Sequence, residues 1–131
     1  MEIVPFEKIN PEKWDNFCLK SDSAWLRHTQ AFIIYTTSLS FENKIRNLSF
    51  AICDQGKIVA LAPIVLHPAY FDQNQFELSM GGMGNPWPLI SAQDKGKKAK
   101  ILKIVFSQID QLAAANKAVC SRMFIDPLGI L

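Results

Sequence analysis

Two apolar segments separated by Gln55-Gly56 constrain the fold of this chain more than any other feature. The segments are NLSFAICD (47–54) and KIVALAPIVL (57–66), and both are rich in β-branched residues. A glycine in a two-residue connection supplies the positive φ angle that a tight hairpin turn requires. The sequence therefore predicts an antiparallel hairpin, with QFELSM (75–80) as a third strand beside it.

Helical patterns flank this hairpin on its N-terminal side. A short strand, EIVPF (2–6), contains a proline that indicates an edge position. Asn10 can cap a first helix that carries Pro11 in its first turn. A second helix is predicted from about Thr29, and its expected buried positions are Phe32, Ile33 and Leu39.

A long amphipathic helix is predicted over residues 91–117. Ser91 can cap its start, and Asp94 three residues later approaches a capping box. The apolar stripe of this helix comprises Ile101, Ile104, Val105, Ile109 and Leu112. VCSRMFI (119–125) then returns as a strand, by a right-handed crossover if it lies parallel beside the strand before the helix.

The resulting order is β, α, α, β, β, β, α, β, which predicts an α/β domain of the α+β type. We expect one mixed, mostly antiparallel sheet of roughly five strands with helices packed on it. A chain of 131 residues is long enough for one domain with a sizeable core. We therefore assign residues 1–131 to a single domain.

Composition and charge exclude several classes of protein. A net charge of +2 gives no reason to expect DNA binding, and no apolar run is long enough for a transmembrane segment. The N-terminus lacks the basic start and apolar core of a signal peptide, so we expect a cytoplasmic protein. The three cysteines, Cys18, Cys53 and Cys120, are far apart and fit buried thiols in a reducing compartment.

Three segments carry a resemblance to a known family. They are WDNFCLKSDSAWLRHTQAF (14–32), FAICDQGKIVALAPIVL (50–66) and the Gly-Gly loop before the long helix. Together they resemble the N-terminal half of the FemAB-like branch of the GNAT-fold acyltransferase superfamily. In that family an "hs-x-x-W"-like segment follows a tryptophan-containing helix, and here it is His28 to Phe32, with phenylalanine at the aromatic position. The family's "g-x-i-v-g-x-x-P" hairpin pattern is matched by Gly56, Ile58, Val59 and Pro63, with Ala60 in place of the second glycine.

The resemblance implies transfer of acyl or aminoacyl groups to amines, commonly in cell-envelope biosynthesis. Acyl-CoA or aminoacyl-tRNA would be the donor, and a small molecule or peptidoglycan precursor would be the acceptor. The chain would be an incomplete GNAT-like unit, the N-terminal, acceptor-side half of a two-domain protein. Its acceptor groove would be lined by Gln30, Phe32, Asn85 and Trp87. No catalytic residue is assigned. The alternative is a non-catalytic ligand-binding module, or one that forms homodimers.

The loop SMGGMGNPWPLI (79–90) allows two interpretations. Its Gly82-Met83-Gly84 begins like a phosphate-binding G-x-G-x-x-G loop, but Trp87 occupies the third glycine position. Pro86 and Pro88 also lack N–H groups, so few amides can converge on an anion. We therefore favour a stiff wall, in which Trp87 either packs on the core or lines a substrate groove.

The remaining polar residues give weaker indications. His28 is expected at the surface or in a helix cap, and His67 in a loop; neither has a second metal ligand at suitable spacing. Each cysteine is expected to be buried rather than nucleophilic. The lysines at the start of the long helix indicate either a solvated face or contact with an anionic partner; they are Lys95, Lys97, Lys98, Lys100 and Lys103.

Overall fold

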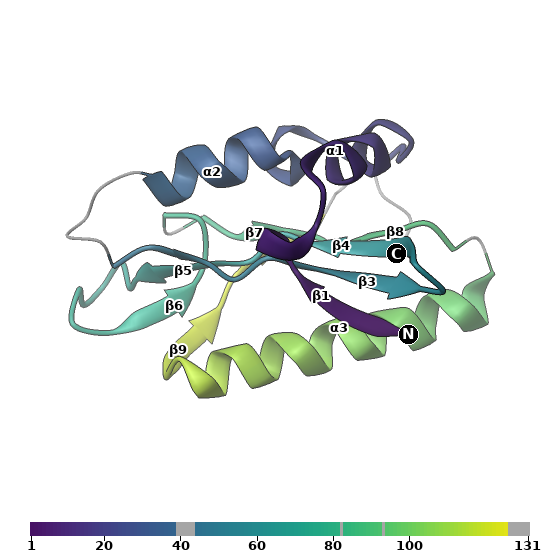
Figure 1. Ribbon diagram of the computed structural model, residues 1–131. Coiled ribbons are helices and arrows are strands. Elements are labelled where there is room, and N and C mark those ends of the chain that lie inside the picture. The colour runs from purple at the N-terminus through teal and green to yellow at the C-terminus, as the bar shows by residue number, and fades with distance from the viewer. Residues whose placement is uncertain (39–43, 82, 93, 126–131) are drawn as a thin grey trace.

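The strands lie between two layers of helix (Figure 1). The computed structural model describes residues 1–38, 44–81, 83–92 and 94–125. Helices α1 (Pro11–Leu19) and α2 (Gln30–Ser38) lie on one side of the strands, and α3 (Lys95–Ala115) lies on the other. Two short 3-10 helices, η1 (Phe6–Lys8) and η2 (Leu26–His28), precede α1 and α2. Leu39, a predicted buried position, and Gly82 of the glycine-rich loop lie outside the described residues.

Within these ranges the strands form three sheets. The first has the order β1-β3-β4-β8, from β1 (Glu2–Pro5), β3 (Phe50–Asp54), β4 (Lys57–Ala62) and β8 (Leu89–Ile90). The second has the order β2-β5-β6-β9, from β2 (Arg46–Asn47), β5 (Val65–Pro68), β6 (Phe76–Leu78) and β9 (Ala118–Ser121). The third pairs β7 (Asn85–Pro86) with β10 (Met123–Phe124). The α+β class with mixed, mostly antiparallel pairing is thus confirmed, although the strands are divided among three sheets rather than one.

The predicted hairpin is confirmed at its turn. Gln55 and Gly56 have φ angles of 51° and 79°, which is the pair of positive values that a type I′ turn requires. The antiparallel register places Asp54 opposite Lys57. The sequence therefore encodes this turn locally.

The single strand predicted over 57–66 was wrong, because the structure divides it between two sheets at Pro63. Proline has no N–H to donate to the hydrogen-bond ladder of a sheet. The Ile64 N–H donates to Ser49 Oγ at 2.9 Å instead of to a strand. The hydroxyl in turn donates to the Ile64 carbonyl at 3.3 Å. A buried serine thus replaces strand pairing at the point where the chain crosses from β4 to β5.

Helix caps follow the sequence at one site and depart from it at another. Asn10 caps α1, since its Oδ1 accepts from the Glu12 N–H at 2.8 Å. The prediction that Ser91 caps α3 was wrong: Asp94 is the cap, and its Oδ2 accepts from the Lys97 N–H at 3.0 Å. Ser91 extends strand pairing beyond β8, because its N–H donates to the Val59 carbonyl at 3.0 Å.

The core has two parts, one on each side of the strands. On the α3 side the predicted helix stripe buries Ile101, Val105 and Ile109 against Ile52, Leu78 and neighbouring strand residues. On the other side the buried residues come from α1, α2 and the strands; they are Trp14, Cys18, Ile33, Ile45, Ala51, Leu61, Val65, Met80 and Leu89. Alternate residues of β3 face the two parts, as period-two alternation requires.

The strand that follows α3 runs parallel to β6, the third predicted strand. β9 pairs with β6, with Phe76 opposite Ala118, and β10 pairs in parallel with β7. The predicted strand–helix–strand unit is therefore present as parallel neighbours. This pairing brings the C-terminal strands beside the 79–90 loop.

Glu77 on β6 is a fully buried carboxylate at this parallel pairing. Its Oε2 accepts from Arg122 Nε at 3.2 Å and from Cys120 Sγ at 3.4 Å, and its Oε1 accepts from Ser79 Oγ at 2.9 Å. Burial alone raises the pKa of Glu77. The hydrogen bonds from Ser79, Arg122 and Cys120, with the charge of Arg122, outweigh burial and hold the pKa below its ordinary value.

We expect Glu77 to make stability depend on pH in the acid range. Because the native pKa is lowered, the unfolded state binds this proton at a higher pH than the native state does. The contribution of Glu77 to the free energy of unfolding is therefore complete above its unfolded pKa of about 4.3. It is lost as the pH falls toward the native pKa. Urea unfolding of wild type and Glu77→Gln between pH 7 and pH 3 measures this. The difference in free energy of unfolding between wild type and Glu77→Gln should shrink below about pH 4.3. Glu12 is exposed, so the control Glu12→Gln should show no such trend. A wild-type advantage over Glu77→Gln that stays constant with pH would contradict it.

Candidate functional site

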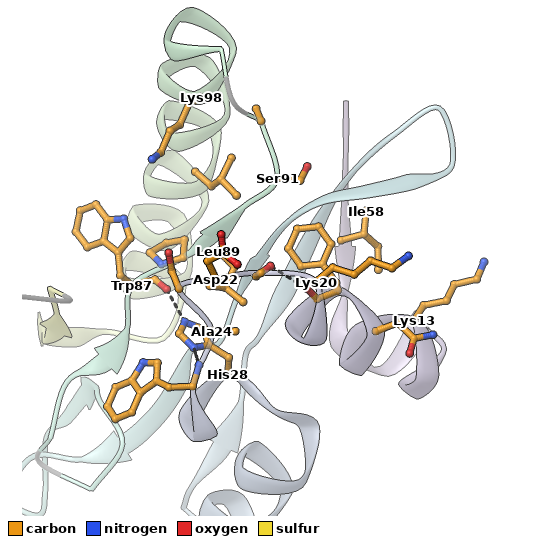
Figure 2. A pocket seen from close by; sticks show the side chains of 18 of the residues that line it. Lys13, Lys20, Asp22, Ala24, His28, Ile58, Trp87, Leu89, Ser91 and Lys98 are labelled. Carbon is orange, nitrogen blue, oxygen red and sulfur yellow. Dashed lines mark hydrogen bonds between the residues drawn. The ribbon is translucent and has the colours of Figure 1, made fainter. Parts of the chain in front are cut away.

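A cavity of about 1030 Å³ opens between the α1–η2 layer and the strands. Its wall is assembled from the α1–η2 connection, the tip of the β3–β4 hairpin, β8 with the residues flanking it, α3 and the end of β10 (Figure 2). The lining residues are Lys13, Asn16, Phe17, Lys20 to Trp25, His28, Gly56 to Ile58, Trp87 to Ala92, Lys98, Phe124 and Ile125. The volume is in the range typical of small-molecule sites.

Aromatic rings form much of one end of this cavity. Trp25, just before η2, lies with its ring centroid 6.2 Å from that of Phe124, at an interplanar angle of 75°. Trp87 connects β7 to β8 and packs against Phe106 of α3, with centroids 5.4 Å apart. Trp87 therefore contacts the helix layer and also lines the cavity.

His28 connects the walls rather than offering a free base. Its Nδ1 accepts from the Trp25 N–H at 3.1 Å, so the proton must be on Nε2, which donates to the Trp87 carbonyl at 2.8 Å (Figure 2). Its own carbonyl accepts from Trp14 Nε1 at 2.7 Å. The ring is 1% exposed, so the expected cap is present at η2, but the expected surface position was wrong. Both ring nitrogens of the neutral imidazole are hydrogen-bonded. His28 therefore holds the segments of Trp25 and Trp87 in place.

Lysines surround the cavity. Lys13 and Lys20 come from α1 and its C-terminal end, Lys57 from β4 and Lys98 from α3. Among the described lining residues, Asp22 is the one carboxylate. In Figure 2, Lys98 lies on the side of Trp87, and Lys13 and Lys20 lie on the side of Ile58. The lining therefore carries an excess of positive charge at both sides, which favours an anionic ligand.

Only part of the predicted lysine cluster takes part in this charge. Lys98 lines the cavity. Lys97 instead forms an ion pair with Asp54 at the end of β3, with Nζ 3.8 Å from Oδ2. Lys95 and Lys100 are exposed. The cluster is thus divided between the cavity, a surface ion pair and solvent.

Four residues were predicted to line an acceptor groove, and the structure places them in different surroundings; they are Gln30, Phe32, Asn85 and Trp87. Only Trp87 lines this cavity. Gln30 begins α2 and its Nε2 donates to Asp15 Oδ2 at 2.9 Å. Phe32 packs against the Arg27 guanidinium, whose central carbon lies 5.4 Å from the centroid of the Phe32 ring. Asn85 is fully buried on β7, where its Oδ1 accepts from the Val65 N–H at 3.2 Å.

Several cavity residues lie in segments whose sequence contains no signal of a site. Lys20 and Trp25 bound the polar stretch between α1 and η2, which reads only as a helix terminator. Lys57 begins strand β4 of the hairpin, and Phe124 ends strand β10. The family resemblance did include Trp25, within the segment 14–32, but as part of a motif rather than as a site residue.

Gly84 in the 79–90 loop is required for close strand packing. A Cβ built on this glycine would lie 2.7 Å from the Phe124 nitrogen and 2.8 Å from the Met123 carbonyl carbon. The next N–H, from Asn85, donates to the Arg122 carbonyl at 2.9 Å. Gly84 thus allows β7 to approach β10, which supports the interpretation of this loop as a wall.

We expect Gly84→Ala to destabilise the protein by about 1–3 kcal/mol, because the methyl group would overlap backbone atoms that cannot rotate away. Thermal or urea unfolding measures the loss. Gly96→Ala is the matched control, since the Cβ there would meet only Asp94 Oδ2, at 3.5 Å. Equal stability of Gly84→Ala and wild type would show that β10 is not packed against this glycine.

The described thiols are not activated nucleophiles. Burial, with Asp15 adding to it, raises the pKa of Cys18 to about 11, and Cys18 Sγ donates to the His28 carbonyl at 3.5 Å. Burial and the hydrogen bond to Glu77 raise the pKa of Cys120. Cys18 is buried as predicted, while Cys53 and Cys120 are half-buried.

Fold and site together define an α+β domain with an aromatic-walled cavity surrounded by lysines. Searches against protein families, curated proteins and solved structures found no match to this chain. In the part of the chain that the structure describes, no helix is long and apolar enough to cross a membrane. The same residues contain no group of three or more histidine, cysteine or carboxylate side chains that could hold a metal ion.

Proposed function

We propose that the cavity binds an anionic small molecule with an apolar or aromatic body, and that this ligand is a substrate of acyl or aminoacyl transfer to an amine. The observation that carries the binding proposal is the composition of the wall. Rings of Trp25, Trp87 and Phe124 meet lysines from three separate elements in one cavity. Stacking would hold the body of the ligand, and the lysines would hold its phosphates or carboxylates.

The topology supports the transferase part of this proposal. A helix pair after β1, an antiparallel hairpin and a parallel strand pair flanking α3 are the arrangement that the GNAT-like resemblance implies. Acyl transfer between a thioester or aminoacyl ester and an amine needs positioned reactants and a stabilised oxyanion rather than a protein nucleophile. In this proposal the chain supplies the acceptor-side half of an N-acyltransferase.

A specific observation favours the second candidate, a binding module without catalysis. His28, the cavity residue whose ordinary pKa is nearest neutrality, has both ring nitrogens bonded to main-chain groups. It therefore cannot accept a proton from an attacking amine without breaking the contacts that hold Trp25 and Trp87.

Calorimetric titration with two anionic probes tests the binding proposal. Decanoyl-CoA represents a donor, and a UDP-linked muramoyl pentapeptide represents a peptidoglycan-precursor acceptor. S-decanoyl-N-acetylcysteamine, which lacks phosphates, is the uncharged control. We expect one anionic probe to bind in a salt-sensitive manner and the control to bind much more weakly. Absence of binding by both anionic probes, or equal binding by the uncharged thioester, would overturn the proposal.

The identity of the bound probe separates the two halves of a transferase reaction. Binding of the pentapeptide supports an acceptor-side role, whereas binding of decanoyl-CoA alone assigns the cavity to the donor. Mass spectrometry of the pentapeptide after incubation with decanoyl-CoA then tests catalysis. Acylated product supports the transferase, and binding without product supports the module.

A further inference from the structure

The Arg27 guanidinium lies within an aromatic cluster beside the cavity. Its central carbon is 5.5 Å from the ring centroid of Trp25, 5.4 Å from that of Phe32 and 5.3 Å from that of Phe124. Distances below about 6 Å are those of favourable cation–π contacts. One side chain of η2 therefore contacts rings from the preceding loop, from α2 and from β10.

The other contacts of Arg27 do not explain why a cation occupies this place. Within residues 1–38, 44–81, 83–92 and 94–125, Arg27 makes no ion pair with a carboxylate. Its Nη2 donates to the Met83 sulfur at 3.1 Å, and sulfur is a weak acceptor. The rings are thus its principal partners.

Two of these three rings form the cavity wall. Trp25 and Phe124 line the cavity, yet they are 46% and 38% exposed, so core packing alone does not fix them. His28 holds the backbone of Trp25 by a hydrogen bond, and its ring meets the indole at one edge, with centroids 6.3 Å apart. The Arg27 guanidinium contacts both exposed rings, which also lie edge to face with each other.

We propose that Arg27 is a positioning residue that fixes Trp25 and Phe124 as the aromatic end of the cavity. Its effect on ligand affinity rests on the proposed function, while its effect on the rings does not. A planar guanidinium can stack on several rings at once, which the compact ammonium of a lysine does less well. Arg27 thereby organises this wall before a ligand arrives.

Fluorine NMR on 5-fluorotryptophan-labelled protein tests the positioning directly. The chain has three tryptophans, and each signal is assigned by a Trp→Phe variant. Arg27→Met keeps much of the side-chain volume but removes the charge, and Arg27→Lys keeps the charge. We expect Arg27→Met to shift or broaden the Trp25 fluorine signal, because the charge over the indole face is lost. Trp87, which packs on Phe106 rather than on Arg27, should keep its signal.

Ligand affinity provides the second measurement. With the probe that binds wild type, we expect Arg27→Met to weaken binding roughly three- to tenfold and Arg27→Lys to restore part of it. An unchanged Trp25 signal in Arg27→Met would overturn the proposal, as would equal changes at Trp25 and Trp87, since these would indicate general loosening. If no probe binds wild type, the proposed function fails, and the Trp25 signal still decides the role of Arg27.

Discussion

Replacing Trp14 with alanine should lower the free energy of unfolding by about 3–5 kcal/mol, the cost typical of removing a large buried aromatic side chain. Trp14 is 1% exposed and lies at the centre of the core between α1, α2 and the strands. Its ring meets Phe6 edge to face, with centroids 4.9 Å apart. The substitution also removes the Nε1 donor from the buried His28 carbonyl. The loss therefore combines a cavity with a buried carbonyl that loses its Trp14 donor and keeps the weak donor Cys18 Sγ.

Urea unfolding at pH 7 measures this effect. Trp25→Ala is the matched control, because the same residue type is about half exposed there and should cost much less. Trp14→Phe should fall between wild type and Trp14→Ala, since it restores most of the volume but not the hydrogen bond. Similar losses for Trp14→Ala and Trp25→Ala would contradict the placement of α1 on the strands.

Reversing two lysine charges at the cavity should weaken binding of the anionic probe at least roughly tenfold at low salt. The variant is Lys20→Glu with Lys98→Glu, which changes one lining residue from the α1 side and one from the α3 side. Each replacement turns an attraction for the ligand's anionic group into a repulsion, and salt should reduce the difference. Titration calorimetry at two salt concentrations measures both effects.

A second charge reversal separates local from long-range electrostatics. Lys95→Glu with Lys103→Glu changes the net charge by the same amount, but both residues are exposed and outside the cavity lining. We expect this control to retain most of the affinity. Equal losses in the two double variants would mean that the overall charge, and not the cavity lysines, governs binding.

Local chemistry made much of the fold predictable. The Gln55-Gly56 turn, the Asn10 cap and the buried stripe of α3 each depend on residues close in sequence. The division of the predicted 57–66 strand was missed although Pro63 lies inside that strand. Its completion by Ser49 could not be predicted locally, because Ser49 lies fifteen residues from Ile64. The cap of α3 was misplaced because Ser91 and Asp94 are both good caps, and pairing of Ser91 with Val59 decides between them.

The cavity was less predictable than the fold because its wall is assembled from distant segments. Four segments that are distant in sequence meet at the cavity in the folded structure: the α1–η2 connection, the hairpin tip, residues 87–92 and the end of β10. The hydrophobic periodicity of any one segment does not indicate which distant segments it will contact. Trp87 was identified as a wall residue from its proline neighbours, but Gln30, Phe32 and Asn85 make contacts elsewhere.

The central claim, that this cavity is a ligand site, is tested most directly by mapping amide chemical shifts during titration with decanoyl-CoA and with the UDP-linked pentapeptide. We predict saturable changes that cluster at residues 21–25, at the hairpin tip 56–58 and at residues 89–92, which line the cavity from three sides. Absence of saturable changes with both probes, or changes confined to α2 and the 70–75 loop, would contradict the claim.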